Sequence, residues 1–142
     1  MNTKRIAIAG IGAGVVIWIV DCIPNAFVLR ERFALLVKAG VFLEQPRLPF
    51  FPLWTLVMLG LGFGLAWLYA AVRPRLGPGP KTAATLGFVV GLMIYLPSNV
   101  AQASWSMVGR FVPLVWLVFG VIGTTAGALV AGALYKEEPA KP

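Results

Sequence analysis

The sequence contains no histidine, one cysteine and few charged residues, and each shortage removes a class of function. Histidine is the commonest metal ligand and general base in proteins. A single cysteine, Cys22, cannot form a disulfide within the chain. These two shortages exclude a zinc site built from cysteines and histidines, and we expect neither a metal nor another cofactor.

Negative charge is also scarce. The chain has 5 Asp and Glu against 12 Lys and Arg, a net charge of +7. Such an excess can indicate a nucleic-acid partner, but these cations stand beside the ends of apolar segments rather than in one patch. Anionic lipid headgroups are the better match for that arrangement. We therefore expect membrane lipid as a partner and no nucleic acid.

What the sequence has in abundance is apolar residues, which make up 59% of its 142 positions. Four apolar runs are each long enough to cross a hydrocarbon core, which takes about 20 helical residues. They cover residues 6–29, 53–72, 82–107 and 112–135. The runs do not alternate apolar and polar residues, which excludes the strands of a membrane barrel. The sequence predicts an all-α, integral membrane four-helix bundle that forms one domain over residues 1–142.

The distribution of Lys and Arg predicts the orientation in the membrane. With the N-terminus inside, seven of these cations are cytoplasmic, namely Lys4, Arg5, Arg73, Arg75, Lys81, Lys136 and Lys141. Five are outside, namely Arg30, Arg32, Lys38, Arg47 and Arg110. Cytoplasmic loops carry the excess of positive residues, so we expect both termini in the cytoplasm. The first run is too long for a signal peptide and lacks a small-residue cleavage site, so we expect it to be retained.

The segment between the first two spans is amphipathic. Glu31, Lys38 and Gln45 recur every seven residues with apolar residues between them. The pattern predicts a helix over about residues 31–45, lying in the outer interface and ended by Pro46 and Pro49. Such a segment serves either as a covering connector or as a lid or docking helix.

Aromatic residues near the span ends are typical of interfacial anchors. They are Trp67, Tyr69 and Tyr135 at one face, and Phe50, Phe51, Trp54, Trp105 and Phe111 at the other. The loop over residues 73–81 reads RPRLGPGPK, and its Pro and Gly residues predict a tight reversal. We expect Arg73, Arg75 and Lys81 to contact lipid headgroups. The phosphate-binding P-loop pattern is missing from this loop.

Small residues recur four apart in every span, which lets helices approach closely in lipid. The first three spans carry Gly10 and Gly14, Gly60 and Gly64, and Gly87 and Gly91. The fourth span carries two such rows, Gly120, Thr124, Ala128 and Gly132, and Gly123, Gly127 and Ala131. One row is expected to pack inside the bundle and the other against a second subunit, although both can also be used internally. A homo-oligomer or a complex with other membrane subunits is therefore expected.

One stripe of residues occurs twice. Gly10, Gly14, Trp18, Asp21 and Asn25 are matched by Gly87, Gly91, Tyr95, Ser98 and Gln102. Because one span lies between the copies, both run in the same direction through the membrane. This repeat predicts two tandem helical hairpins related by an axis along the membrane normal, with the first and third spans in contact.

The polar members of the stripe form the candidate site. With Asn99 added, the predicted intramembrane cluster is Asp21, Asn25, Ser98, Asn99 and Gln102. A carboxylate inside a span is costly unless it is paired or hydrated, so such residues are functional candidates. The cluster either binds a proton, a cation or a small polar ligand, or joins helices by hydrogen bonds. Pro24 and Pro97 free carbonyl groups nearby, and Cys22 is expected to be a small apolar residue rather than a reactive thiol.

Residues 67–83 read WLYAAVRPRLGPGPKTA. This segment, together with a similar start over residues 4–25, resembles an uncharacterised family of small bacterial integral membrane proteins with four spans. The resemblance implies a location in the bacterial inner membrane. Because that family has no established activity, it implies no catalytic or ligand-binding residue. The arginine-rich motif of four-span membrane enzymes that use glutathione is not present.

These observations favour a non-catalytic membrane protein that self-associates or acts as an accessory subunit of a larger bacterial membrane complex. The alternative is a small transporter or an ion-binding or proton-binding protein that uses the cluster around Asp21. A membrane enzyme ranks third, since the sequence offers no nucleophile and base pair and no metal-ligand set.

Overall fold

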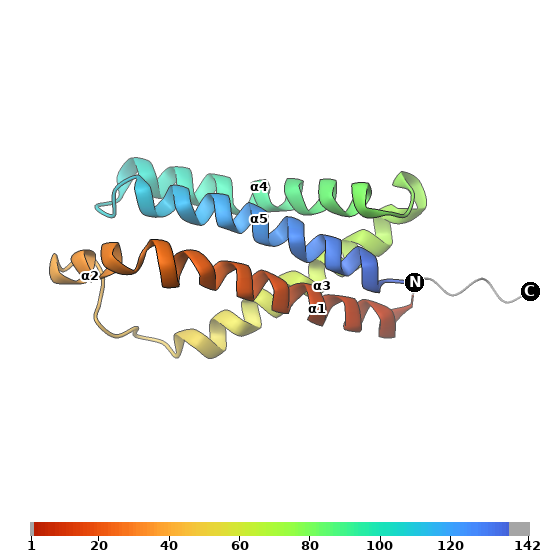
Figure 1. Cartoon of the computed structure of the whole chain (residues 1–142), viewed down its shortest axis with the longest axis horizontal. Coiled ribbons are helices and arrows are strands. Elements are labelled where there is room, and N and C mark those ends of the chain that lie inside the picture. The colour runs from red at the N-terminus through yellow and green to blue at the C-terminus, as the bar shows by residue number, and fades with distance from the viewer. Residues whose placement is uncertain (1, 137–142) are drawn as a thin grey trace, which may run out of the picture.

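The computed structural model describes residues 2–136, which are helical along most of their length (Figure 1). The elements are α1 (Thr3–Ile23), a π-helical turn η1 (Pro24–Val28), α2 (Arg30–Lys38), α3 (Phe50–Leu76), α4 (Pro80–Trp105) and α5 (Phe111–Leu134). No strand occurs within the described residues, so the all-α prediction is confirmed. Four helices, α1 continued by η1, α3, α4 and α5, are long and apolar enough to cross a membrane.

The ends of the long helices lie within a few residues of the predicted spans. Between α3 and α4, Gly77 and Gly79 have φ angles of 82° and 133°, a region that L side chains rarely adopt. Pro80 then opens α4 at a position where its missing N–H costs nothing. The tight reversal therefore comes from the glycines and proline of the RPRLGPGPK loop. Lys141 and the C-terminus lie outside the described residues.

The helix after the first span is shorter than predicted. α2 ends at Lys38, and the prediction that Pro46 and Pro49 end it near residue 45 is wrong. Gly40 has a φ of 72°, its N–H donates to the Val37 carbonyl at 2.9 Å, and the Val41 N–H donates to the Leu36 carbonyl at 2.9 Å. These two bonds form the glycine-dependent helix end known as a Schellman motif. Residues 39–49 then connect α2 to α3 without forming a helix.

α5 is the central helix of the bundle. It packs along α4 and along α1 and also contacts α3, while α1 packs along α3. Figure 1 shows α5 lying between α1 and α4. The predicted packing of the first span against the third is therefore wrong, because each of these spans packs mainly against other helices. The N-terminus and the turn between α3 and α4 lie at one end of the bundle, and α2 lies at the other.

The small residues of the repeated stripe explain these pairings. A Cβ added at Gly10 would lie 2.6 Å from Cδ1 of Phe63 on α3, and one at Gly14 would lie 2.8 Å from the Leu59 Cα. A Cβ at Gly87 would lie 2.6 Å from the Thr124 carbonyl oxygen on α5. Gly91 also meets α5. Each copy of the stripe thus allows close approach to the next long helix along the chain.

Both small-residue rows of α5 are used inside the chain. Gly120 faces the Tyr95 ring on α4, and Gly123 and Gly127 face Ile17 on α1. Gly132 lies against Ala83 on α4 and Tyr69 on α3. The expectation that one row serves a second subunit is therefore wrong for α5, because a central helix needs a close-packing surface on more than one side.

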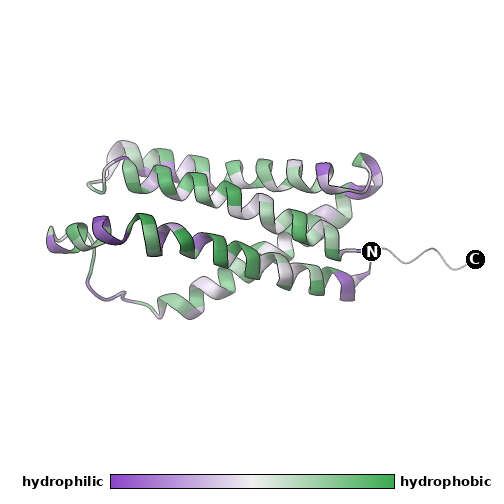
Figure 2. Ribbon diagram, in the orientation of Figure 1, coloured by the Kyte–Doolittle hydropathy of each residue, from purple (hydrophilic) through white to green (hydrophobic). Residues whose placement is uncertain are grey.

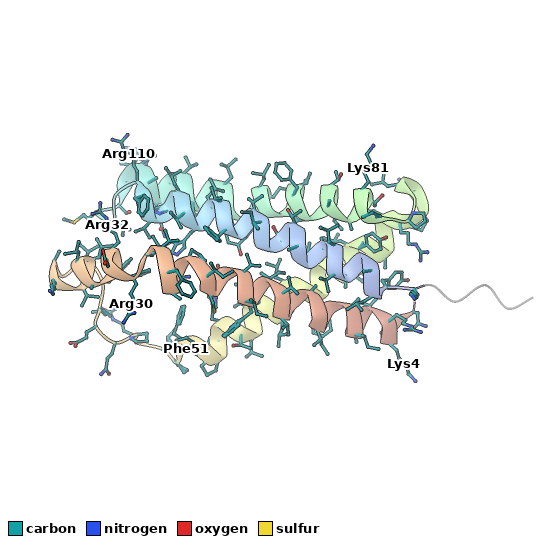
Figure 3. The ribbon with its side chains drawn as sticks, in the orientation of Figure 1. Lys4, Arg30, Arg32, Phe51, Lys81 and Arg110 are labelled. Carbon is teal, nitrogen blue, oxygen red and sulfur yellow. The ribbon has the colours of Figure 1, made fainter. Side chains whose placement is uncertain are left out.

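Apolar and charged residues are separated along the helices. Figure 2 shows that the ribbon is hydrophobic over most of the four long helices and hydrophilic toward their ends. Large apolar side chains such as Leu56, Phe63 and Ile122 are exposed on the outside of the bundle. Lys4 and Lys81 lie at one end, and Arg30, Arg32 and Arg110 lie at the other (Figure 3). An apolar belt therefore lies between two charged ends.

Candidate functional site

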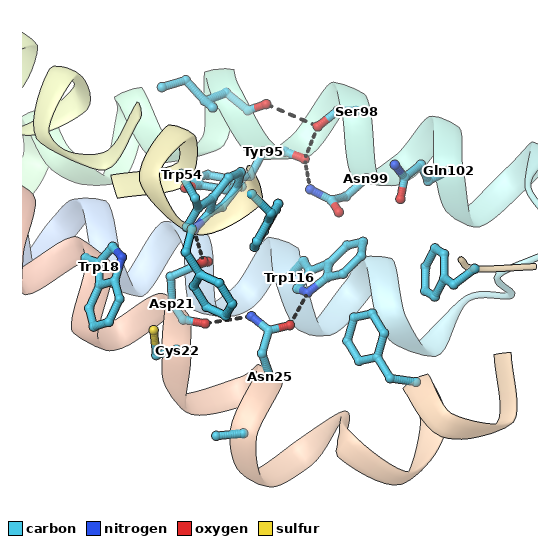
Figure 4. A pocket seen from close by; sticks show the side chains of 16 residues that line it. Trp18, Asp21, Cys22, Asn25, Trp54, Tyr95, Ser98, Asn99, Gln102 and Trp116 are labelled. Carbon is cyan, nitrogen blue, oxygen red and sulfur yellow. Dashed lines mark hydrogen bonds between the residues drawn. The ribbon is translucent and has the colours of Figure 1, made fainter. Parts of the chain in front are cut away.

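A cavity of about 740 Å³ lies between the long helices toward the end that carries α2 (Figure 4). Residues from α1, η1, α2, the 39–49 connector, α3, α4 and α5 line it. All five residues of the predicted polar cluster are among them, namely Asp21, Asn25, Ser98, Asn99 and Gln102. The cluster residues of α1 and α4 therefore share a cavity although these helices do not pack along each other.

Asp21 stands on the inner face of α1 and is 8% exposed. Nε1 of Trp54, on α3, donates a hydrogen bond to Oδ2 of Asp21 at 2.9 Å. No other described side chain donates to the carboxylate, and no Lys or Arg lines the cavity. Buried charges in proteins are normally paired or fully hydrogen-bonded. The carboxylate thus retains capacity to accept bonds from a molecule in the cavity.

Asn25 is fixed by the π-helical turn. Pro24 interrupts the ordinary helical bonding, and the Leu29 N–H donates to the Pro24 carbonyl at 2.8 Å across the wider turn. Nδ2 of Asn25 donates to the Asp21 carbonyl at 2.8 Å. Oδ1 accepts from Nε1 of Trp116, on α5, at 3.0 Å. Single π-helical turns are frequent at functional sites, and this one holds an amide at the cavity wall.

On the α4 side of the cavity, Ser98 and Asn99 bond within their own helix, and Gln102 lines the cavity beside them. Nδ2 of Asn99 donates to the Tyr95 carbonyl at 2.8 Å. Oγ of Ser98 lies 3.4 Å from both the Ile94 and Tyr95 carbonyl oxygens. No hydrogen bond among the described residues joins these side chains to Asp21 or Asn25. The two halves of the cluster face each other across the cavity (Figure 4).

The interhelical bonds of the site instead involve Trp54 and Trp116. The sequence predicts an interfacial role for Trp54 and assigns no role to Trp116. A buried indole N–H normally needs an acceptor, and polar side chains within the apolar spans can provide one. The sequence therefore indicates that tryptophans bond to these polar residues. Which tryptophan bonds to which residue depends on how the helices pack.

Aromatic side chains form much of the cavity wall. They are Trp18, Phe33, Phe42, Phe50, Phe51, Trp54, Tyr95 and Trp116. The Phe33 ring on α2 stacks on the Phe42 ring of the connector at 5.2 Å and lies 5.9 Å from the Trp116 ring. The Phe50 ring stacks on Trp54 at 5.4 Å. α2 and the connector therefore contribute part of the wall, as a covering segment would.

Two lining residues, Trp18 and Cys22, carry polar atoms that make no hydrogen bond to other cavity residues. Nε1 of Trp18 is buried and has no acceptor among the described residues. Cys22 follows Asp21, is partly buried and carries a free thiol. The indole N–H is a donor without a partner among the described residues. The thiol is the only one in the sequence and can be labelled selectively.

The residues predicted to contact lipid headgroups lie at the other end of the bundle. The Arg73 guanidinium lies 5.8 Å from the centre of the Tyr135 ring, and Arg75 and Lys81 are exposed. Tyr69 and Tyr135 are buried at 2% and 3% exposure. These two tyrosines thus contribute to the core of that end instead of projecting from it as interfacial anchors.

Comparison with protein-family models, with curated proteins and with solved structures gives no match. The interpretation of the cavity therefore rests on its own geometry. Its wall combines a fixed carboxylate, a fixed amide and many aromatic rings, and known sites for small molecules likewise combine apolar walls with a few placed polar groups.

Proposed function

We propose that this protein crosses a bacterial inner membrane four times, as two tandem hairpins formed by α1 with α3 and by α4 with α5. The apolar length of the four helices, the charged ends and the close packing within each pair support this arrangement. Both termini lie in the cytoplasm in this arrangement, because that orientation puts the larger number of Lys and Arg residues on the cytoplasmic side. α2 then lies at the outer interface, and Arg75 and Lys81 lie at the inner headgroups.

Within that setting, the protein is a non-catalytic binding protein for a small amphipathic molecule. The observation that carries this function is the cavity of about 740 Å³, in which the polar groups of α1 and α4 face each other without bonding. Ligand pockets span roughly 300–1,000 Å³ and combine apolar walls with a few placed polar groups. Asp21 and Asn25 do join helices, through Trp54 on α3 and Trp116 on α5. Ser98 and Asn99 bond only within α4, so on that side of the cavity joining helices does not account for the polar side chains.

The structure favours binding over a continuous transport path. Toward the N-terminal end, the bundle is filled by a buried core of small residues and two tyrosines, namely Ala9, Ala13, Ala66, Tyr69, Ala70, Ala83, Ala131 and Tyr135. A path across the membrane needs polar groups or an opening through both halves. The site is therefore a chamber on one side of the membrane.

The thiol of Cys22 provides the test, because it is the only thiol and lines the cavity. The protein in lipid nanodiscs is alkylated with N-ethylmaleimide, and the rate is followed by mass spectrometry. Two probes with apolar bodies are tested, N-phenyl-1-naphthylamine and tetraphenylphosphonium. We expect at least one of them to slow the reaction. In a Cys22→Ser, Met107→Cys control, whose thiol lies on the exposed loop, the rate should not change. An unchanged Cys22 rate with both probes would contradict the proposal.

A second candidate function, self-association or docking as an accessory subunit, is favoured by the outer face of α3. Gly60 and Gly64 lie four residues apart, and a Cβ added at either would meet nothing within 4 Å. Such a face suits close approach of another membrane helix. Crosslinking in nanodiscs or membranes should give dimers that Gly60→Leu and Gly64→Leu reduce. A monomer at all protein-to-lipid ratios, with no co-purifying partner, would contradict this candidate.

A further inference from the structure

The sign of charge in the cavity wall narrows the class of ligand. Among residues 2–136, Asp21 is the sole acidic residue that lines the cavity, and no basic residue lines it. The nearest basic residues in sequence, Arg30 and Arg32 on α2, are exposed instead. An anionic ligand would face a carboxylate without a compensating cation, whereas a cation would complete the pair that Asp21 lacks.

The aromatic wall favours the same sign. The face of an aromatic ring is negative and attracts cations, most strongly at tryptophan, and aromatic cages of this kind bind quaternary ammonium groups. Three tryptophans line the cavity, namely Trp18, Trp54 and Trp116. Trp54 and Trp116 use their ring N–H in hydrogen bonds to Asp21 and Asn25. These bonds involve the ring edge and hold each indole in place.

The apolar part of the wall sets the remaining requirement. Phe33, Phe42, Phe50, Phe51 and Ile94 line the cavity, and a small hydrated ion would leave these surfaces without apolar contact. A bulky organic cation covers them while its charge meets Asp21. We propose that the cavity selects lipophilic organic cations, with the Asp21 carboxylate as counter-charge and the tryptophans as the surrounding cage. This inference rests on the proposed binding function and names the class of its ligand.

Three probes of similar shape and different charge test the inference. Tetraphenylphosphonium is cationic, triphenylphosphine oxide is neutral and tetraphenylborate is anionic. Binding to the protein in nanodiscs is measured by equilibrium dialysis, with empty nanodiscs of the same lipid to subtract partition into the bilayer. We expect the cation to bind at least about tenfold more tightly than the other two, the scale of a cation–π attraction in a site shielded from water.

Variants then locate the charge. Asp21→Asn keeps the size of the side chain and an oxygen that accepts from Trp54. It removes the coulombic attraction to the cation and should weaken cation binding about tenfold or more. Glu31→Gln neutralises an exposed carboxylate outside the cavity and should leave binding unchanged. Asp21→Glu restores the charge and should recover part of the affinity. Thermal unfolding of each variant shows whether the fold is retained.

The outcomes separate this inference from the function on which it rests. Equal binding of the three probes to the wild-type protein would overturn the selection of cations while the binding function stands. Failure of all three probes, together with no protection of Cys22, would overturn both. Cation binding that Asp21→Asn leaves unchanged would overturn the assignment of Asp21 as counter-charge. The charge series on the wild-type protein is decisive even if a variant fails to fold.

Discussion

Two tryptophans of the cavity wall have the same chemistry but opposite hydrogen-bond states. Trp54 donates to Asp21 at 2.9 Å, whereas the buried N–H of Trp18 has no acceptor among the described residues. Changing Trp54 to Phe leaves a largely buried carboxylate without its donor, while changing Trp18 to Phe removes a donor that has no partner. We expect Trp54→Phe to be the more destabilising change by about 1–3 kcal/mol, the cost of leaving a buried polar group unpaired.

The measurement is unfolding of both variants under identical detergent and lipid conditions. Each variant is the control for the other, since both lose the same ring atoms. Equal losses of stability would mean that the Trp54 hydrogen bond contributes nothing net. A larger loss for Trp18→Phe would show that packing of the Trp18 ring outweighs its unpaired N–H.

At the residue scale, the sequence identifies the polar half of the cavity wall and misses the indole donors. Asp21, Asn25 and Asn99 stand out because a polar side chain inside an apolar span is energetically costly and is therefore a functional candidate. Trp54 does not stand out, because a tryptophan near a span end also suits the interface. The two roles differ only in which neighbour the N–H meets, and that depends on tertiary packing.

At the scale of the helix, one glycine on α3 sets the closest approach of two helices. A Cβ added at Gly62 would run into the backbone of Gly10 and Gly14 on α1, and backbone atoms have little freedom to move aside. The same addition at Gly64, two residues along the same helix, meets nothing within 4 Å. We expect Gly62→Ala to destabilise the bundle by about 1–3 kcal/mol or more, as overpacking does, and Gly64→Ala to be neutral.

Thermal unfolding in detergent measures both glycine variants, with far-UV circular dichroism to check helix content. Similar melting temperatures for Gly62→Ala and the wild-type protein would contradict the close contact between α1 and α3. A loss confined to Gly64→Ala would contradict the openness of the outer α3 face.

The same glycines show why the spans are predictable and their packing is not. Span positions follow from apolar length, a property of each segment alone. Gly10, Gly14, Gly87 and Gly91 mark faces suited to close approach, yet they do not specify the partner. Two similar stripes suggested contact with each other, whereas each packs against the following long helix. Gly40 is also a local signal, because it ends α2, but Pro46 and Pro49 predict a later end.

At the scale of the whole molecule, the two ends of the bundle differ in how closely their interiors are packed. The end with the N-terminus has a packed core of small residues and tyrosines, and the end with α2 holds the cavity. If the protein spans a membrane, the cavity therefore belongs to one leaflet, and orientation decides which compartment can supply the ligand. The difference of seven cations against five predicts that α2 and the cavity lie on the outer side.

Cysteine labelling tests that orientation, because Cys22 can be replaced by serine to give a background without cysteine. Met107, 87% exposed on the loop between α4 and α5, and Arg75, exposed near the turn between α3 and α4, lie toward opposite ends of the bundle. A membrane-impermeant maleimide should label Met107→Cys in intact spheroplasts and Arg75→Cys only after permeabilisation. The reverse pattern would place the cavity on the cytoplasmic side. Labelling of both sites in intact spheroplasts would contradict a single membrane-crossing orientation.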